Sequence, residues 1–282
     1  MKRHTLPRFR STTAGIQRGR WILLAAMLLL LAAPVWAQEW NVQLVDDSGN
    51  TGHQSQIVVA SDGTPYITYK NTSNQLNLAW WVEDESQRGW NFHVLSDATY
   101  GAVMEVLIDD DDYLHVAWSR TSQVRYGVFD PATLTWVVPI ETVSTSYYNA
   151  DVDLAIRLEG SDWIPSVAFN SYGDPVRVAT RDPGSGDWSE EQVSTVHANW
   201  GAPSIGVDSE GGHHVSFYES NGGNLMYAVK SAGSGTWAEQ VVDIDGNVGS
   251  YSSIVIDDTD TIHIAYYDIT NGDLKYATTS GR

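Results

Sequence analysis

Two acidic side chains, Glu105 and Asp153, stand at matching positions in two repeated segments of the sequence. Glycoside hydrolysis uses two carboxyl groups about 5–10 Å apart across a cleft. The other repeats carry Gln56, Ser204 and Ser253 at this position. Acidic residues are abundant in this chain, so a chance pair in such a column is common. We therefore expect recognition rather than catalysis, and keep this pair as the catalytic candidate.

A second group combines aromatic and polar side chains in the loops that follow the first, Trp-led strand of each repeat. These residues are Tyr100, Tyr148, Asn149, His197, Trp200 and Tyr251. Aromatic rings stack on the C–H face of a sugar, while amide and imidazole groups bind its hydroxyls. The alternative is structural, with the rings folded over the sheet ends to seal the core. As a set they are the predicted ligand-binding residues, because loops on a rigid scaffold commonly carry binding sites.

The Asp-rich segments allow a third chemistry, calcium binding. Asp243, Asp245 and Asn247 alternate around Gly246 in the loop after the Trp-led strand of the last repeat. Oxygen ligands at alternate positions beside a glycine are typical of calcium loops, but the full spacing and the closing Glu are missing. Asp is also favoured in turns for its local hydrogen bonds. We therefore expect turn formation and no cofactor, with calcium as the alternative.

All of these residues are positioned by a unit that the chain repeats five times. The units start at Trp40, Trp90, Trp136, Trp188 and Trp237, with spacings of 46 to 52 residues. Each unit contains a Trp-led strand, a loop and three apolar strands separated by Asp/Gly-rich turns. Four strands in about 50 residues are typical of a β-propeller blade. Both faces of the strands are apolar or small, which indicates sheets that pack on both sides.

The two ends of the repeat region predict how the fold closes. The first Trp strand, residues 40–46, has no preceding three strands, and the last unit has no following Trp strand. Pairing residues 40–46 with the last unit, as its outer strand, leaves no exposed edge at the seam. The predicted fold is therefore all-β. It is a single five-bladed propeller over residues 38–282 with four-stranded blades.

The repeats resemble the secreted, sialidase-like propeller repeats, through motifs such as I-H-I-A-Y-Y-D at 262–268 and L-K-Y-A at 274–277. The five Trp-led units also resemble the five-bladed tachylectin-type lectins. The turns S-A-G-S-G-T-W at 231–237 and D-P-G-S-G-D-W at 182–188 are similar to the Asp-box of sialidases, S-x-D-x-G-x-T-W. The Asp of the box is absent, and the first turn is one residue short. The resemblance therefore implies the propeller architecture and not the sialidase activity.

The first 37 residues have the features of a signal peptide. Basic residues precede an apolar run over 21–33, and Val35-Trp36-Ala37 suits cleavage before Gln38. The run is shorter than the roughly 20 residues that a membrane-spanning helix needs. The alternative to cleavage is that the segment is retained as a membrane anchor. We therefore predict a secreted or periplasmic protein with no stable membrane insertion after cleavage.

The charge and the absence of cysteine exclude several classes of function. Six basic residues lie in the leader, which leaves 10 Lys and Arg against 35 Asp and Glu, a formal charge of about −25. Such a surface repels phosphate backbones and anionic lipid, so nucleic acid is not an expected partner. No Cys is present, so disulfides and thiolate metal sites are excluded.

The function favoured by these features is a non-enzymatic recognition module. We expect a monomer that binds an extracellular glycan or protein on its loop face. One alternative is a glycoside hydrolase or lyase that uses Glu105 and Asp153. The other is a protein-interaction scaffold of the cell envelope.

Overall fold

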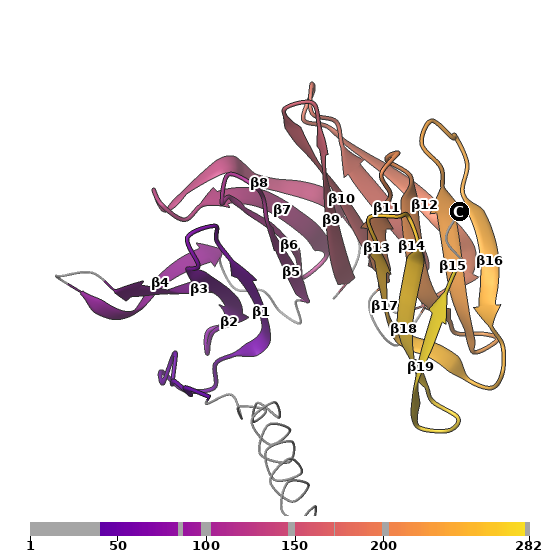
Figure 1. Ribbon diagram of the computed structural model, residues 1–282, viewed down its shortest axis with the longest axis horizontal. Helices are drawn as coiled ribbons and strands as arrows, with labels where there is room; N and C mark the ends of the chain where they lie inside the picture. The colour runs from indigo at the N-terminus through magenta and orange to yellow at the C-terminus, as the bar shows by residue number, and fades with distance from the viewer. Residues whose placement is uncertain are drawn as a thin grey trace, which may run out of the picture. The chain divides into compact units, whose positions relative to one another are not determined.

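The structure is a computed structural model that describes residues 40–83, 87–96, 103–145, 150–171, 173–198 and 203–279. The chain divides into two units, Met1–Leu44 and Val45–Arg282. The described part of the second unit is built from β-strands, shown in Figure 1. Within the described ranges, no helix has the length and apolar character to cross a membrane.

Five antiparallel sheets follow one another in chain order, from the indigo β1 to the yellow β19 (Figure 1). The first contains β1 (His53–Val59), β2 (Pro65–Lys70), β3 (Leu76–Glu83) and β4 (Arg88–Ser96). The second contains β5 (Met104–Ile108), β6 (Leu114–Arg120), β7 (Gln123–Asp130) and β8 (Thr135–Thr145). The third contains β9 (Asp151–Glu159), β10 (Asp162–Asn170), β11 (Pro175–Arg181) and β12 (Trp188–His197).

The fourth sheet contains β13 (Ser204–Val207), β14 (His213–Glu219), β15 (Asn224–Lys230) and β16 (Ala238–Asp243). The fifth contains three strands, β17 (Val248–Ile256), β18 (Ile262–Asp268) and β19 (Asp273–Thr278). In each sheet the strands pair in sequence order, and the strand opened by a repeat Trp is the outer strand of the preceding sheet. This meander confirms the predicted blade-like units.

In four of the five sheets, the turn between the first two strands is held by an Asp side chain that accepts hydrogen bonds from backbone N–H groups of the same turn. Asp109 Oδ1 accepts bonds from the backbone N–H groups of residues 111 and 113, at 3.0 and 2.9 Å. Asp257 Oδ1 does the same with residues 259 and 261, at 2.8 and 2.9 Å. Asp112 and Asp260 adopt φ values of 64° and 59°, a left-handed conformation that Asp tolerates. These Asp runs form turns, as predicted.

The hydrophobic core lies between neighbouring sheets. The innermost strands contact one another in succession, β1 with β5, β5 with β9, β9 with β13 and β13 with β17. One aromatic position on each second strand is at most 4% exposed in all five sheets, at Tyr69, Trp118, Phe169, Phe217 and Tyr266. These rings fill the space between neighbouring sheets, and the second, third and fourth sheets pack on both faces, as predicted.

Closure by the N-terminal segment is the part of the predicted fold that is not seen. Residues 40–46 belong to no strand, and the fifth sheet has three strands instead of four. Within the described ranges, β17 packs on β13 and makes no comparable contact with β1. The prediction of four-stranded units therefore holds for the first four sheets.

Candidate functional site

One polar position on the innermost strands aligns across all five sheets. Its members pair with the residue just before the buried aromatic of the second strand. They are Gln56 with Thr68, Glu105 with Ala117, Asp153 with Ala168, Ser204 with Ser216 and Ser253 with Ala265. The strand register therefore confirms the alignment of Glu105 with Asp153 that the repeats predicted.

Hydrogen bonds connect this column from sheet to sheet. Gln56 Nε2 donates to Glu105 Oε2 at 3.0 Å, which joins the first and second sheets. Ser204 Oγ donates to Asp153 Oδ2 at 2.9 Å and accepts from the backbone N–H of Ile254 at 3.1 Å. These bonds join the third, fourth and fifth sheets. Between the second and third sheets, the negative charge of Asp153 acts on the carboxyl group of Glu105. Polar interactions therefore run along this column from the first sheet to the fifth.

The two carboxyl groups of this column have altered acidity. Burial, and then the negative charge of Asp153, raise the pKa of Glu105 to about 8. Burial also raises the pKa of Asp153, although its carboxylate accepts bonds from Ser204 and from the backbone N–H groups of Leu154 and Ile205. Glu105 is thus protonated at neutral pH and can donate a proton beside a fixed carboxyl group.

The predicted ligand-binding residues fall partly outside the described ranges. Tyr100, Tyr148, Asn149 and Trp200 lie outside the residues that the structure describes. His197 is exposed at the end of β12, and its ring contacts the backbone carbonyl of Gly173.

Tyr251 in β17 is 67% exposed and has a φ of 53°. This conformation is rare for a bulky residue, so the local fold must impose it. His197 and Tyr251 both lie where an outer strand leads to the next innermost strand, as predicted.

The calcium candidates bind other protein groups. Asp243 accepts a bond from the Tyr266 hydroxyl at 2.7 Å and forms an ion pair with Lys275. Asn247 Oδ1 instead accepts a bond from the Tyr218 hydroxyl at 2.7 Å. Asp245 donates its backbone N–H to Asp243. Over the ranges that the structure describes, no group of three or more His, Asp or Glu side chains is arranged to hold a metal ion.

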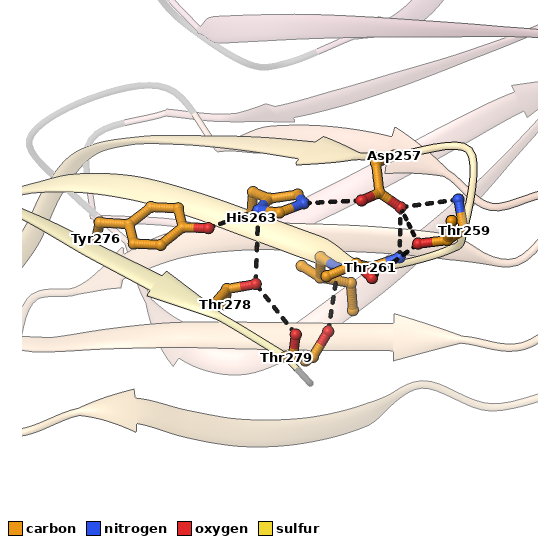
Figure 2. A network of polar contacts seen from close by, with 8 residues as sticks. Asp257, Thr259, Thr261, His263, Tyr276, Thr278 and Thr279 are labelled. Atoms are coloured by element: carbon orange, nitrogen blue, oxygen red, sulfur yellow. Dashed lines mark hydrogen bonds and ion pairs between the residues drawn. The ribbon is translucent and has the colours of Figure 1, made fainter. Parts of the chain in front are cut away.

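Three histidines form the same bridge in three separate sheets. In each, Nε2 contacts an Asp of the first turn at 3.0 to 3.1 Å, and Nδ1 contacts a Tyr hydroxyl of the third strand at 2.5 to 2.6 Å. The sets are Asp109–His115–Tyr126, Asp208–His214–Tyr227 and Asp257–His263–Tyr276. Figure 2 shows the last set, where Thr259 and Thr261 also bind Asp257. The bridges tie a turn to the third strand of its own sheet, so these histidines have a structural role.

A cleft of about 670 Å³ opens between the third and fourth sheets. Its lining includes Arg157 of β9, Thr180 of β11, His213 of β14, Lys230 of β15, and Trp237 just before β16. These residues lie near the first and third turns of each sheet, at the opposite end from the loops that hold His197 and Tyr251. The sequence contained one sign of this cleft, the two degenerate Asp-box turns, which contribute Pro183 and Gly233 to its rim.

The polar groups of the cleft are held in fixed positions. His213 Nε2 lies 2.7 Å from Ser166 Oγ and 3.4 Å from Thr180 Oγ1. Burial, and then the positive charges of Lys230 and Arg157, lower the pKa of His213 to about 4. The imidazole is therefore neutral at neutral pH, with one nitrogen that donates and one that accepts.

Glu191 anchors the opposite wall of the cleft. It accepts bonds from Trp237 Nε1 at 3.1 Å and from Lys230 Nζ at 2.6 Å. The cleft thus combines an indole ring, a neutral imidazole, a hydroxyl and paired charges. This set of groups can bind a ligand that is rich in hydroxyls.

Comparisons with known proteins identify the fold. No protein-family model and no curated protein sequence matches the chain. AofleA from Arthrobotrys oligospora has a similar structure, with a TM-score of 0.58 and 12% identity over 87% of this chain and 74% of that one. The lectin SapL1, in complex with alpha methyl fucoside, has a TM-score of 0.55 and 12% identity over 80% of this chain and 79% of that one.

The NanB sialidase from Streptococcus pneumoniae is also similar, with a TM-score of 0.50 and 15% identity. The match covers 77% of this chain but 36% of the sialidase. At these identities the likeness concerns the fold and not the activity. The chain therefore shares the propeller-like, all-β fold of these lectin and sialidase structures.

Proposed function

We propose that the chain is an exported, non-enzymatic recognition module that binds carbohydrate in the cleft between the third and fourth sheets. The observation that carries the proposal is the meeting of Trp237, His213 and Thr180 in one cleft of about 670 Å³. Small-molecule sites have volumes of about 300–1,000 Å³ and place a few polar groups on an apolar wall. The cleft therefore suits a monosaccharide or disaccharide.

The chemistry of the cleft favours a neutral, hydroxyl-rich ligand. The indole of Trp237 offers a face for the C–H groups of a sugar ring, and its N–H is already bound to Glu191. The neutral imidazole of His213 and the hydroxyl of Thr180 can each donate or accept. The shared fold with SapL1, a lectin bound to a methyl fucoside, supports a saccharide as the class of ligand.

The experiment is glycan-array binding of the mature protein, residues 38–282, with and without calcium. Trp237→Ala should abolish binding because it removes the aromatic wall. Trp188→Ala is the matched control, since Trp188 holds the same repeat position and donates its N–H to Glu141 at 2.9 Å. Binding that persists in a folded Trp237→Ala protein but is lost in Tyr251→Ala would move the site to the loop face with Tyr100, Tyr148 and Trp200.

If no glycan binds in either condition, the proposal fails. A protein-interaction scaffold of the cell envelope then becomes the leading function. Fusion of residues 1–37 to a reporter tests export, and light scattering tests the proposed monomer.

A second candidate function is glycoside hydrolysis by Glu105 and Asp153. It is favoured by the raised pKa of Glu105, about 8, next to a second carboxyl group. A general acid that is protonated at neutral pH is what such a reaction requires. Aryl glycosides would reveal turnover, which Glu105→Gln should abolish and Trp188→Ala should retain.

We also infer that the five sheets close into a five-bladed propeller, with residues 40–46 as the outer strand of the fifth blade. The support is a face of the first sheet that lacks a cover. Ile57 of β1 is 61% exposed, whereas its equivalents Val106, Leu154, Ile205 and Ile254 are at most 5% exposed. Tyr276 of β19 is 60% exposed, whereas the equivalent Tyr126 is 1% exposed. Packing the fifth sheet on the first would bury such apolar surfaces.

A further inference from the structure

Two arginines, Arg120 and Arg125, lie on one face of the hairpin formed by β6 and β7. Arg120 pairs with Gln123 across the hairpin, and Arg125 pairs with Trp118. Side chains of directly paired residues, and of residues two apart on a strand, point to the same side of a sheet. The strand register therefore places both guanidinium groups beside the Trp118 ring.

Neither arginine has a carboxylate partner among the described residues, which sets them apart from the others. Every other described arginine forms an ion pair, Arg88 with Glu83, Arg157 with Glu159, Arg177 with Glu190 and Arg181 with Glu141. Burial, and then the charge of Arg120, lower the pKa of Arg125. Two adjacent cations without a counter-ion are unfavourable unless an anion joins them. Because acidic residues outnumber basic ones so strongly, this arrangement is unusual for the chain.

The two arginines line a pocket of about 350 Å³ between the first and second sheets. Val94, Leu95 and Ser96 of β4 form one wall, and Trp118 and Ile140 form another. Trp118 is 1% exposed, and its indole N–H has no hydrogen-bond partner among the residues that the structure describes.

Arg125 is held in place before any ligand arrives. Gln123 Oε1 accepts bonds from its Nε at 3.0 Å and its Nη2 at 2.5 Å. This orients the guanidinium plane while Nη1 makes no bond to Gln123. Since little side-chain freedom is left to lose, binding of an anion costs less entropy.

We propose that this pocket binds the anionic group of an acidic saccharide, either a uronate carboxylate or a sulfate ester. Guanidinium groups bind such oxyanions through two parallel hydrogen bonds. The pocket volume lies within the range of small-molecule sites, so part of the sugar ring enters as well. The inference that a saccharide carries the anionic group rests on the proposed function, whereas the inference that an anion binds here rests on the two arginines alone. The pocket lies near the second turn of its sheet, at the other end from the cleft that holds Trp237.

The test is calorimetric titration of the mature protein, residues 38–282, at low salt. The probes are methyl glucuronide and galactose 6-sulfate, their neutral counterparts methyl glucoside and galactose, and sodium sulfate alone. We expect saturable binding of the acidic sugars, weakened by added salt. The neutral sugars should bind at least 10-fold more weakly at this pocket.

Variants identify the residues that bind. Arg120→Gln and Arg125→Gln should each weaken binding of the acidic sugars at least 10-fold, and Arg125→Lys should weaken it less because it keeps the charge. Arg88→Gln is the matched control, since Arg88 is exposed and paired with Glu83. Trp237→Ala should leave this binding unchanged, so the failure of the cleft and the failure of the arginine pocket are distinguishable.

Three results would overturn the proposal. One is equal binding of acidic and neutral sugars. Another is unchanged binding in either folded Gln variant. The third is sodium sulfate that binds as tightly as the acidic sugars, because the pocket would then be an ion site without a saccharide.

Discussion

The carboxylate of Asp46 accepts a hydrogen bond from the Tyr69 hydroxyl at 2.8 Å, and Asp243 repeats the contact with Tyr266 at 2.7 Å. In both cases 23 residues separate the partners. The following glycines, Gly49 and Gly246, also both have positive φ values, 136° and 99°. Because Asp243 ends the outer strand β16, Asp46 corresponds to the end of an equivalent outer strand.

This equivalence predicts a specific register for ring closure. Glu239 pairs with Ala228 in the fourth sheet, so the proposed closure would pair Val42 with Ala277. The natural chain has no Cys, so Val42→Cys with Ala277→Cys should form a single disulfide on oxidation. Closing so long a loop should stabilise the protein by about 2–4 kcal/mol. Mass spectrometry and urea unfolding, with and without reductant, measure both effects.

The matched control for closure is Val42→Cys with Lys275→Cys. Lys275 lies two residues from Ala277 on the same strand, so its Cα should be too distant from residue 42 for a strain-free bridge. Equal cross-linking of the two pairs would contradict the predicted register.

Glu105 should make stability depend on pH in the direction opposite to most carboxylates. Its pKa of about 8 in the folded state exceeds the ordinary value of 4.5, so the folded state holds a proton that the unfolded state releases. Stability should therefore fall as pH rises from about 5 to about 8. Glu105→Gln should flatten this dependence, measured as Tm against pH. Glu83→Gln, on the exposed end of β3, should leave the wild-type slope unchanged.

Asp243 should contribute stability with the usual sign for a carboxylate. Partial burial opposes its ionisation, but bonds from Lys275, the backbone of Asp245 and Tyr266 lower its pKa to about 2. The contribution is therefore present above pH 3.8 and is lost as pH falls toward 2. Lys275→Gln should destabilise the protein at pH 7 and have little effect near pH 2. An equal loss at both values, in urea unfolding, would show that Lys275 acts through packing.

The first turns of neighbouring sheets are joined by a bond that can be tested directly. Asp112 accepts from the backbone N–H of Ser61 at 2.7 Å and from its hydroxyl at 2.6 Å. Asp112→Ala should destabilise by about 1–3 kcal/mol, because two hydrogen bonds are lost and Ala disfavours the positive φ. Asp112→Asn should cost less. Asp110→Ala, an exposed position of the same turn, serves as the control in chemical denaturation.

The sequence predicted the architecture well because its signals are local and repeated. Trp residues at regular spacing, apolar strands and Asp-rich turns each mark an element that forms within one unit. The column through Glu105 and Asp153 followed from the same alignment. Closure by residues 40–46 depends on contact between the two ends of the repeat region, and no local pattern encodes it.

The Arg120–Arg125 pocket was missed for an instructive reason. The arginines do not recur from unit to unit, so an alignment of repeats gives them no weight. Their meeting depends on the register of one hairpin, in which Arg125 pairs with Trp118. The cleft at Trp237 was missed because it lies between two sheets, where residues such as Arg157 and Lys230 are far apart in sequence.

The hydrogen bonds that join the first turns of neighbouring sheets are unevenly distributed among the described residues. Asp112 holds Ser61 between the first and second sheets, and Asp260 holds Ser209 between the fourth and fifth, at 2.9 and 2.7 Å. In the described ranges, the two junctions of the third sheet have no such bond. Ion pairs join the third sheet to its neighbours instead, Arg181 with Glu141 toward the second sheet and Lys230 with Glu191 toward the fourth. Because salt screens ion pairs, added salt should loosen the third sheet more than the sheets joined by turn bonds. Glu191 also lines the Trp237 cleft, so a ligand bound there would contact a residue that fastens the third sheet to the fourth.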